Sequence, residues 1–493
     1  MSLPFSTLVV LDRSSSMPLY NQVANRLISL IGQGKILPGT FLPATREMAL
    51  LLKIHRKTVI QAYDELEIQG WIEPVSRKGF RVLLDLPIVK PRSFKPKDHF
   101  LLSNATVEEV FSNAEPLLLS ERETYTNRSI VVDDGFPDIK LSPFEEFFSQ
   151  YRTILRENLV RDVMLQNNDG GQLHLRESTS GFLNDTRGLN IMYEHLMITR
   201  GAQMAIFIAA ALLINPGDKV IVTEPNYFMA DQIFKQRGAE LCRIPVDGEG
   251  MNVNILESYL KKDKFKLLYI IPHHHHPTTV TMSTSRRIAL LNLVKQYDLW
   301  VIEDDYDYDF HYRNSPILPL ASADHNGKVI YIGSYTKLLG ASFRIGYMVA
   351  GKQFIRQAMS YRKLMDIRGD FMMEEGLARL IDNGEIGRHI KRSKRIYAER
   401  FEIASNLIEK ELGHAVDFTR PQGGMAIWLR FKKQYPLAGI LNKVKKHELY
   451  LKGSAYYKNH KTDLNSIRFG FASLDVNDLK TTVGILQRTL KDF

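Results

Sequence analysis

The chain has 493 residues, too many for a single hydrophobic core, so we expect two or three domains. With 44% hydrophobic and 24% charged residues it has the composition of a globular protein, and no run of about 20 apolar residues predicts a membrane span. The N-terminus lacks the basic and apolar regions of a signal peptide, and Cys242 is the single cysteine, so we expect a cytoplasmic protein without an intramolecular disulfide.

Positive charge is concentrated near the N-terminus. The net charge of the whole chain is +10, and residues 1–100 carry 14 lysines and arginines against 8 aspartates and glutamates, a net charge of +6. This asymmetry favours an anionic partner for the N-terminal part, with nucleic acid as the first candidate. A basic surface exposed to solvent is the alternative, and charge alone does not decide between the two.

The N-terminal segment has the pattern of three helices followed by a hairpin. The predicted helices and strands cover, in chain order, residues 18–31, 45–52, 55–69, 71–74 and 79–82. Thr45 can cap the second helix, and Gly70 ends the third. Paired helices with a tight turn and a two-stranded wing predict a winged helix-turn-helix domain over residues 1–83. The alternative is a small helical cap whose basic residues are only solvated.

Basic and polar side chains lie where a winged helix-turn-helix contacts DNA. The second helix of the pair enters the major groove with its N-terminal end, and the wing suits phosphates or the minor groove. The predicted DNA-binding residues are Thr45, Arg46, His55, Arg56, Lys57, Thr58, Arg77 and Lys78. A double-stranded DNA operator is therefore the predicted partner of this domain.

This segment resembles the DNA-binding domain of GntR-family regulators. The resemblance rests on the string Leu42-Pro43-Ala44-Thr45-Arg46-Glu47 and on the spaced positions Thr58, Val59, Ala62, Tyr63, Leu66, Gly70 and Gly79. One position departs from the family, because His55 stands where those proteins usually have a serine that caps the recognition helix. Imidazole is a poorer cap, so either the helix start is looser or His55 itself contacts DNA.

A change of composition separates this domain from the rest of the chain. Residues 90–97 alternate prolines with basic residues, a pattern that is extended and disfavours a helix, while residues 107–120 can hold a short helix. We interpret residues 84–127 as a partly ordered linker.

From residue 128 onward, apolar runs alternate with helical patterns. Continuous apolar runs are typical of parallel strands buried on both faces, and they cover residues 219–222, 267–271, 300–302 and 329–332. Helices fit between them, for example over residues 203–213 and 285–297. The pattern predicts an α/β fold with crossover connections for a large domain over residues 128–374.

A lysine surrounded by groups that suit a phosphate is the most informative feature of this domain. Lys337 can form an imine with an aldehyde cofactor. Ser334 offers a hydroxyl three residues before it, and Arg344 offers a guanidinium seven residues after it. Gly201-Ala202-Gln203 opens a predicted helix, where free backbone N–H groups bind phosphate. Together these residues predict an anchor for pyridoxal phosphate.

Three further side chains suit the ring of that cofactor. Tyr227 follows a predicted strand and can stack on a pyridine. Asp304 can hold the pyridine nitrogen protonated, which makes the ring an electron sink, and Tyr306 can donate to the phenolate oxygen. Asp305 is the alternative for the nitrogen contact. Each feature alone has an ordinary explanation, such as a helix cap or a solvated charge, but all of them occur in one consistent order.

The order and the strings resemble the fold-type I aminotransferase superfamily. With the N-terminal domain attached, the chain is most similar to the MocR/GabR group of GntR-family regulators. Further matching strings are Gly135-Phe136-Pro137-Asp138, Leu175-Arg176-Glu177, Pro277-Thr278 and Arg388-His389. The resemblance implies pyridoxal 5′-phosphate as the cofactor, with Lys337 as its Schiff-base lysine, Asp304 at the pyridine nitrogen and Tyr306 at the phenolate oxygen. The residues implied around its phosphate and ring are Gly201, Ala202, Gln203, Ser334, Arg344 and Tyr227.

Residues 375–493 look like the small α+β domain of that superfamily. Two strands are predicted, over residues 423–429 and 466–471. Arg468 falls where aminotransferases place the arginine that binds a substrate carboxylate, a task that suits the bidentate geometry of guanidinium. The alternative is an arginine solvated at the end of a strand.

A run of four histidines, His273–His276, invites a metal interpretation. Consecutive side chains of an extended segment alternate sides, so at most two of them converge on one ion, and no second ligand cluster is evident; we predict no metal. Many aminotransferases carry Asn-Pro-Thr-Gly at this place, with the asparagine near the phenolate oxygen. This chain has His276-Pro277-Thr278-Thr279, which argues against efficient transamination.

We therefore expect a homodimeric, ligand-responsive transcription regulator of the bacterial cytoplasm, which senses an amino compound through its pyridoxal domain. The first alternative is an active aminotransferase with an accessory DNA-binding domain, which the intact lysine and aspartate permit. The second alternative is a DNA-binding scaffold that holds pyridoxal 5′-phosphate constitutively and does not respond to an effector.

Overall fold

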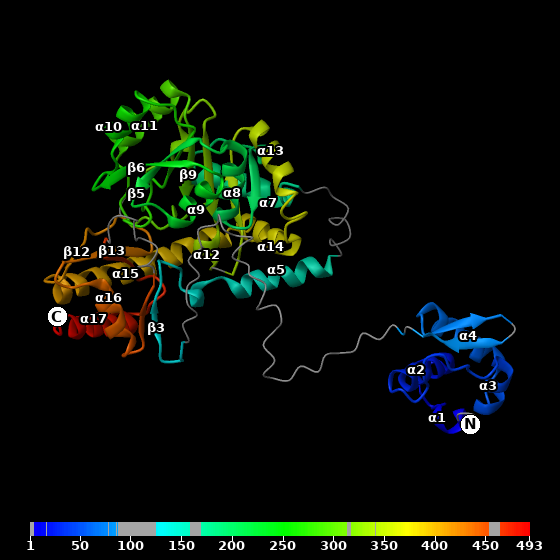
Figure 1. Cartoon of the computed structure of the whole chain (residues 1–493). Helices are drawn as coiled ribbons and strands as arrows, with labels where there is room; N and C mark the ends of the chain where they lie inside the picture. Colours follow the sequence, from blue (N-terminus) through cyan, green and yellow to red (C-terminus); the bar gives the residue numbers. More distant parts are fainter. Residues whose placement is uncertain are drawn as a thin grey trace. The chain divides into compact units, whose positions relative to one another are not determined.

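The computed structural model describes residues 4–15, 17–76, 78–84, 86, 125–157, 169–312, 317–340, 342–452 and 464–493. The chain divides into two compact units, residues 1–121 and 122–493, which are described separately (Figure 1). Arg77 and most of the predicted linker, including its predicted helix over residues 107–120, lie outside the described residues. The predicted domain boundaries stay predictions.

The N-terminal unit is a helical core with an antiparallel hairpin. Its elements are α1 (Phe5–Leu8), α2 (Leu19–Gly32), α3 (Thr45–Leu52), α4 (Arg56–Ile68), β1 (Ile72–Val75) and β2 (Gly79–Val82). Val23, Leu27 and Leu66 are fully buried between the helices, which is why their helical spacing predicted α2 and α4. Tyr63 fixes the hairpin to α4, because its ring packs edge-on against Phe80 at 5.2 Å.

One detail of the predicted capping is wrong. Thr45 is the first residue of α3, and Ala44 stands at the N-cap without a side-chain cap. The Thr45 Oγ1 atom instead accepts a hydrogen bond of 3.3 Å from Arg56 Nε. The hydroxyl therefore connects the two helices of the helix-turn-helix. Gly70 follows the end of α4 with a φ of +74°, as its predicted role as a helix stop requires.

The second unit is built on a mixed, mostly parallel sheet of eight strands, which confirms the predicted α/β class. In spatial order the strands are β4 (Leu196–Thr199), β11 (Gly346–Val349), β10 (Val329–Ser334), β9 (Trp300–Asp305), β8 (Leu267–Ile270), β5 (Lys219–Glu224), β6 (Glu240–Asp247) and β7 (Gly250–Met251). Strands β10, β9, β8, β5 and β6 pair in parallel, while β11 is antiparallel to both neighbours. The apolar runs of the sequence are therefore the central strands.

Helices cover both faces of this sheet (Figure 1). They include α7 (Leu173–Arg187), α8 (Ala202–Leu213), α9 (Phe228–Gln236), α10 (Val253–Leu260), α11 (Thr284–Tyr297), α12 (Thr336–Leu339), α13 (Lys352–Arg362) and α14 (Phe371–Asp382). Neighbouring residues of one strand join different hydrophobic clusters: Ile302 packs with α8, α9 and α13, and Val301 packs with α10 and α11. Since both faces are buried, the strands read as continuous apolar runs rather than alternating ones.

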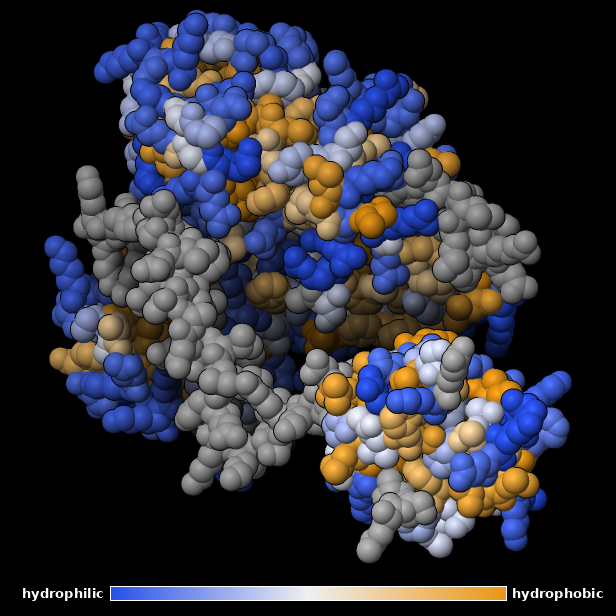
Figure 2. Space-filling model, turned by 45° about the vertical axis from the view of Figure 1, so that its right-hand side comes forward, coloured by the Kyte–Doolittle hydropathy of each residue, from blue (hydrophilic) through white to orange (hydrophobic). Residues whose placement is uncertain are grey.

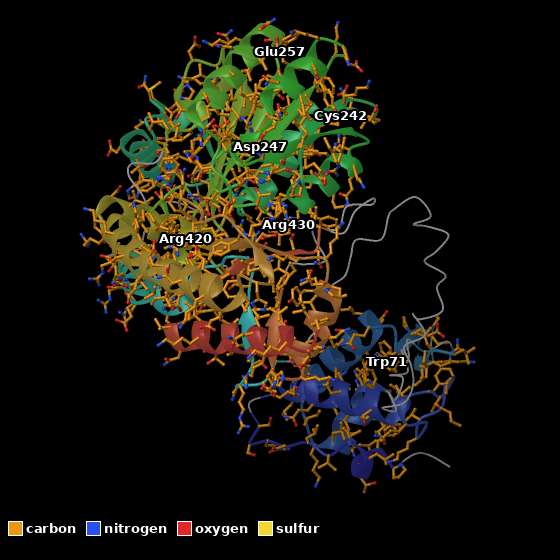
Figure 3. The ribbon with its side chains drawn as sticks, turned by 90° about the vertical axis from the view of Figure 1, so that its left-hand side faces the viewer. Trp71, Cys242, Asp247, Glu257, Arg420 and Arg430 are labelled. Carbon is orange, nitrogen blue, oxygen red and sulfur yellow. The ribbon has the colours of Figure 1, made fainter. Side chains whose placement is uncertain are left out.

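The C-terminal part adds a small antiparallel sheet and long helices. Its elements are α15 (Glu385–Leu412), β12 (Val416–Asp417), β13 (Ala426–Phe431), α16 (Leu437–Lys445), β14 (Leu449–Leu451), β15 (Ser466–Gly470) and α17 (Val476–Leu490). Strands β12, β13 and β15 form the sheet. Arg420 pairs with Glu402 and Glu409 of α15 (Figure 3).

The start of the second unit joins this C-terminal part. Strand β3 (Ile130–Val132) pairs in parallel with β14, and Figure 1 shows it beside α16 and α17. The helix α5 (Phe144–Arg156) follows and contacts α14. The segment between β3 and α5 is thereby held between the large sheet and the C-terminal strands.

Polar side chains predominate on the face shown in Figure 2, with apolar residues scattered among them. Among the described residues, no helix has both the length and the apolar composition needed to cross a bilayer. Cys242 lies on β6 (Figure 3), where burial raises the pKa of its thiol and so disfavours the reactive thiolate.

Candidate functional site

A cavity of about 160 Å³ lies at the carboxyl ends of the parallel strands, the usual ligand position in an open α/β sheet. It is lined by residues at or just after the ends of β5, β8, β9 and β10, by the start of α8, and by residues that follow β3. The lining residues are Asp134, Phe136, Ala202, Gln203, Tyr227, Ile271, His276, Asp304, Tyr306, Ser334, Thr336, Lys337 and Arg344.

Most of the predicted cofactor residues therefore meet in one place. Gly201 adjoins the cavity through Arg344, and Arg468 lies behind its wall. The sequence did not single out Asp134 or Phe136 as wall residues, whereas His276 lines the cavity at the place where the aminotransferase asparagine was expected. Asp134 stands directly before the string Gly135-Phe136-Pro137-Asp138, so that string was the available signal for both residues.

Lys337 brings a buried amine to the cavity. It lies in the short helix α12, and its Nζ atom donates a hydrogen bond of 2.6 Å to the carbonyl oxygen of Gly135. The same atom lies 4.0 Å from the centroid of the Phe136 ring. Burial, followed by the charge of Arg468, lowers the pKa of Lys337. A lysine with a lowered pKa keeps more of its amine unprotonated, which makes it a better nucleophile.

Asp304 and Asp305 lie on opposite faces of β9, because side chains alternate along a strand. Asp304 lines the cavity, whereas Asp305 accepts a hydrogen bond of 2.9 Å from the hydroxyl of Tyr331. The Oδ1 atom of Asp305 also lies 3.4 Å from His273 Nδ1, an electrostatic contact rather than a well-formed hydrogen bond.

The Asp304 carboxyl has one oxygen free for a ligand. Its Oδ2 atom accepts a hydrogen bond of 2.7 Å from the Tyr269 hydroxyl. Its Oδ1 atom is buried and has no hydrogen-bond partner in the described part of the chain. Burial raises the pKa of Asp304 to about 7. A protonated ring nitrogen at this oxygen would supply the missing partner, so the residue fits the pyridine of pyridoxal phosphate.

The other end of the cavity suits a phosphate. Helix α8 begins after Gly201 without a side-chain cap, so its first N–H groups are available to an anion. Gly201 has a φ of +78°, and a Cβ there would lie 3.2 Å from the Arg344 guanidinium. Ser334 Oγ donates to Thr336 Oγ1 at 2.9 Å. Backbone N–H groups, hydroxyls and a guanidinium thus converge, which is the donor set that phosphate needs.

The aromatic residues and Arg468 form a connected wall. The rings of Tyr227 and His276 meet edge-on at 5.1 Å. The Tyr306 hydroxyl donates to the carbonyl oxygen of His274 at 2.8 Å and accepts from the Arg468 guanidinium at 2.9 Å. A phenolate oxygen in the cavity would therefore compete with the His274 carbonyl for the Tyr306 hydrogen.

The four histidines contact four different partners. His273 Nε2 donates to the carbonyl oxygen of Ile317 at 2.5 Å, and His274 Nδ1 donates to Asp307 at 2.9 Å. His275 lies 2.9 Å from the Thr223 hydroxyl, and His276 Nε2 donates to Asp134 at 2.8 Å. In the described part of the chain, no group of three or more His, Cys, Asp or Glu side chains is placed to hold a metal ion.

In the N-terminal unit, His55 occupies the N-cap of α4. Its Nδ1 atom accepts a hydrogen bond of 3.2 Å from the backbone N–H of Lys57, so the imidazole replaces the usual serine. The other predicted DNA-binding residues that the structure describes lie at the starts of α3 and α4 and in the hairpin turn: the exposed Arg46, Arg56, Lys57 and Lys78, and the partly exposed Thr45 and Thr58. These basic and polar side chains are therefore at least partly accessible to a DNA duplex.

Two family models match the chain. The model described as aminotransferase class I and II matches residues 162–485, and the model described as bacterial regulatory proteins of the gntR family matches residues 19–82. The first match covers well over half of the chain, and the second covers the helix-turn-helix and wing. The sequence-based prediction of both parts is confirmed.

Individual relatives repeat this division. The probable rhizopine catabolism regulatory protein MocR of Rhizobium meliloti is 28% identical over 86% of this chain and 84% of its own. Aromatic-amino-acid aminotransferase 1 of Thermococcus litoralis is 28% identical over 74% of this chain and 89% of its own.

A solved structure extends the likeness to three dimensions. The α-aminoadipate aminotransferase LysN of Thermus thermophilus, crystallised with N-(5′-phosphopyridoxyl)-L-leucine, is 25% identical, with a TM-score of 0.68 over 74% of this chain and 93% of its own. The protein therefore belongs to the class I and II aminotransferase family and carries a GntR-type DNA-binding domain at its N-terminus, the architecture of the MocR-type regulators.

Proposed function

We propose that the protein is a pyridoxal 5′-phosphate-dependent regulator of transcription that binds duplex DNA through its N-terminal unit and senses an amino compound in the cavity around Lys337. The observation that carries this proposal is the presence, on one chain, of a buried lysine amine among phosphate-binding groups and of a basic helix-turn-helix surface. A plain enzyme does not need the second part, and a plain DNA-binding protein does not need the first.

Each part of the cofactor has residues that fit it. Pyridoxal phosphate supplies an aldehyde that condenses with amines and a ring that accepts electrons. Lys337 would be its covalent anchor, and the free Oδ1 atom of Asp304 would face its ring nitrogen. The start of α8, Ser334 and Arg344 would hold its phosphate. The phosphopyridoxyl group in the Thermus thermophilus structure supports the choice of cofactor.

The sensing step would depend on the Lys337 amine. An amine effector would compete with Lys337 for the aldehyde of the cofactor. Its binding would release the Nζ atom of Lys337 from the cofactor, and this atom could then contact the carbonyl oxygen of Gly135. Gly135 and its neighbours follow β3, the first strand after the linker, so a change at this wall has a covalent route toward the DNA-binding unit. An effector shifts DNA binding only by its differential affinity for two conformations of the protein.

A homodimer is part of the proposal, because fold-type I sites are usually built at a subunit interface. Two DNA-binding units would then read two half-sites about one helical turn apart, or a multiple of it. An effector that changes the geometry of the dimer would change the fit to that spacing.

An active aminotransferase is the second candidate, favoured by the same Lys337 and Asp304 and by the relatives with that activity in their names. The sequence His276-Pro277-Thr278-Thr279 and the engaged hydroxyl of Tyr306 weigh against efficient turnover.

The DNA-binding half of the proposal can be tested with duplex DNA from the region upstream of the gene. Binding should weaken steeply with salt, because basic side chains displace counterions from the phosphates. Arg56→Ala should weaken binding to this duplex by about 1–3 kcal/mol if the guanidinium reads a base. Equal losses on the upstream duplex and on random DNA would instead assign Arg56 to a phosphate.

A further inference from the structure

The carboxylate of Asp134 stands between the cavity and the buried guanidinium of Arg468. Asp134 lines the cavity and its side chain is 26% exposed, whereas Arg468 is fully buried on β15. The Oδ1 atom of Asp134 lies 3.4 Å from Arg468 Nε, and its Oδ2 atom accepts a hydrogen bond of 2.8 Å from His276 Nε2. A ligand in the cavity therefore meets a carboxylate before it meets the arginine.

Each of the three nitrogens of the Arg468 guanidinium donates a hydrogen bond within the chain. Its Nε atom donates to the backbone carbonyl of Asp134 at 3.1 Å, and its two terminal nitrogens donate to Pro277 O at 3.3 Å and to the Tyr306 hydroxyl at 2.9 Å. A ligand carboxylate that approaches this group has to compete with Asp134 and Tyr306. In an aminotransferase this arginine would bind the carboxylate of a ligand. Here the carboxylate of Asp134 lies against it instead.

The backbone holds Asp134 in this position. The Oδ1 atom of Asp133 accepts hydrogen bonds of 2.8 Å from the backbone N–H groups of both Gly135 and Phe136, which closes a tight turn. Gly135 has a φ of +84°, and a Cβ there would lie 3.1 Å from Ala426 Cβ. Because the turn is packed against β13, the backbone of Asp134 is held in place, and the contacts with His276 and Arg468 hold its side chain.

We infer that Asp134 is a specificity-determining residue and that the effector class is primary amines without a carboxylate on the amine-bearing carbon, rather than α-amino acids. The carbonyl oxygen of Gly135 accepts a hydrogen bond from the Lys337 amine, and Asp134 is the residue directly before Gly135. A ligand amine that takes the place of Lys337 brings its own α-carbon close to Asp134. An α-carboxylate there has to compete with the Asp134 carboxylate for the Arg468 guanidinium, whereas a hydrogen or an alkyl group does not.

A further feature supports this assignment. Burial lowers the pKa of His276, so His276 is a neutral donor to Asp134 and adds no positive charge for a ligand carboxylate. The inference rests on the proposed function, since it names the class of compound that the Lys337 cavity senses.

The experiment compares two ligands that differ only by a carboxylate. Full-length protein loaded with pyridoxal 5′-phosphate is titrated with ethylamine and, separately, with racemic alanine, and the absorbance of the bound cofactor gives each half-saturating concentration. Propylamine and 2-aminobutanoate form a second pair. The wild-type protein should respond to each amine at a lower concentration than to the paired amino acid.

Asp134→Asn removes the charge and keeps the shape of the side chain. The ratio of the half-saturating concentrations, amino acid over amine, should fall by about tenfold or more, the size of one hydrogen bond to a charged group. Asp133→Asn is the matched control, because its amide oxygen can still accept from Gly135 and Phe136 while the carboxylate that touches Arg468 stays. This control should keep the wild-type ratio.

The inference would be overturned if the wild-type protein preferred the amino acids. It would also be overturned if the ratio in Asp134→Asn fell by less than tenfold, stayed the same or rose. Asp134→Ser serves if Asp134→Asn does not fold. Failure of the proposed function looks different: the cofactor would not attach to Lys337, or none of the four ligands would change its absorbance.

Discussion

Lys337 and Gly135 are 202 positions apart in the sequence, yet the Nζ atom of Lys337 donates a hydrogen bond of 2.6 Å to the carbonyl oxygen of Gly135. The amine on the short helix after β10 is therefore held by the segment that follows β3. Any ligand that engages this amine removes a contact between the cavity and that segment. In the proposed function this contact is the first point at which the state of the cavity reaches the rest of the chain.

The lowered pKa of Lys337 predicts covalent capture of pyridoxal phosphate at unusually low pH. Burial favours the neutral amine, so the capture rate should rise with a midpoint below the ordinary lysine pKa of about 10.4. Borohydride reduction followed by peptide mass spectrometry should place the cofactor on Lys337, and Nα-acetyl-lysine serves as the reference amine. A midpoint equal to that of the reference, or a product on another lysine, would contradict the assignment.

Gly346 should be essential to the phosphate end of the cavity. A Cβ at this position would lie 2.6 Å from the backbone carbon of Gly201, so Gly346→Ala must push the start of α8 away. We expect binding of pyridoxal phosphate to weaken by about tenfold or more, or about 1.4 kcal/mol, and binding of pyridoxal, which lacks the phosphate, to change less. Gly351→Ala is the control, because a Cβ there meets no atom within 4 Å. Equal losses of affinity for pyridoxal phosphate and for pyridoxal would show that Gly346→Ala disturbs more than the phosphate end of the cavity.

Much of this architecture could be predicted from local patterns. The apolar runs of the central strands, the helix starting at residue 202 and the wing all depend on residues close in sequence, so periodicity and turn residues reveal them. That most of the predicted cofactor residues line one cavity could be expected as well, because they lie at or just after strand ends that face the same edge of the sheet.

The contacts that shape the ligand-facing wall could not be predicted in this way. Asp134 and Arg468 are 334 positions apart, and the paired residues of β3 and β14 are 319 positions apart. No periodicity reports such a contact. The cap of α3 was missed for a related reason, because the Thr45 hydroxyl bonds to Arg56 of the next helix instead of its own backbone.

His55 should stabilise the N-terminal unit as the cap of α4. Because its Nδ1 atom accepts from the Lys57 N–H, His55→Ala should lower the free energy of unfolding of this unit by about 1 kcal/mol, and His55→Ser should restore it. Chemical denaturation followed by circular dichroism measures both variants. If His55 only caps the helix, His55→Ser binds the upstream duplex as the wild type does, whereas a loss of affinity at full stability would show that the imidazole contacts DNA.

The pair formed by His174 on α7 and Glu375 on α14 should make stability depend on pH. A hydrogen bond to Glu375 at 3.0 Å raises the pKa of His174 to about 9, above its value of about 6.5 in the unfolded chain. The stabilisation is therefore fully present below pH 6.5 and is lost as the pH rises through about 9.

Since the ring is partly exposed, His174→Gln should cost only about 1 kcal/mol at pH 6. The wild type and the variant should have nearly equal unfolding free energies at pH 10. Urea denaturation at both pH values measures the two differences, and a difference that persists unchanged at pH 10 would rule out the charged pair as its cause.

The most direct test of the regulator is to follow the cofactor and the DNA complex in the same samples. Full-length protein bound to the upstream duplex is titrated with an amine, ethylamine first, while cofactor absorbance and DNA binding are recorded together. We predict that both change over one concentration range in the wild type and that neither changes in Lys337→Ala, whose N-terminal unit still binds DNA. Sustained turnover of an amino acid and a keto acid at about 1–10 per second, with DNA binding unaffected by every amine tested, would contradict the account.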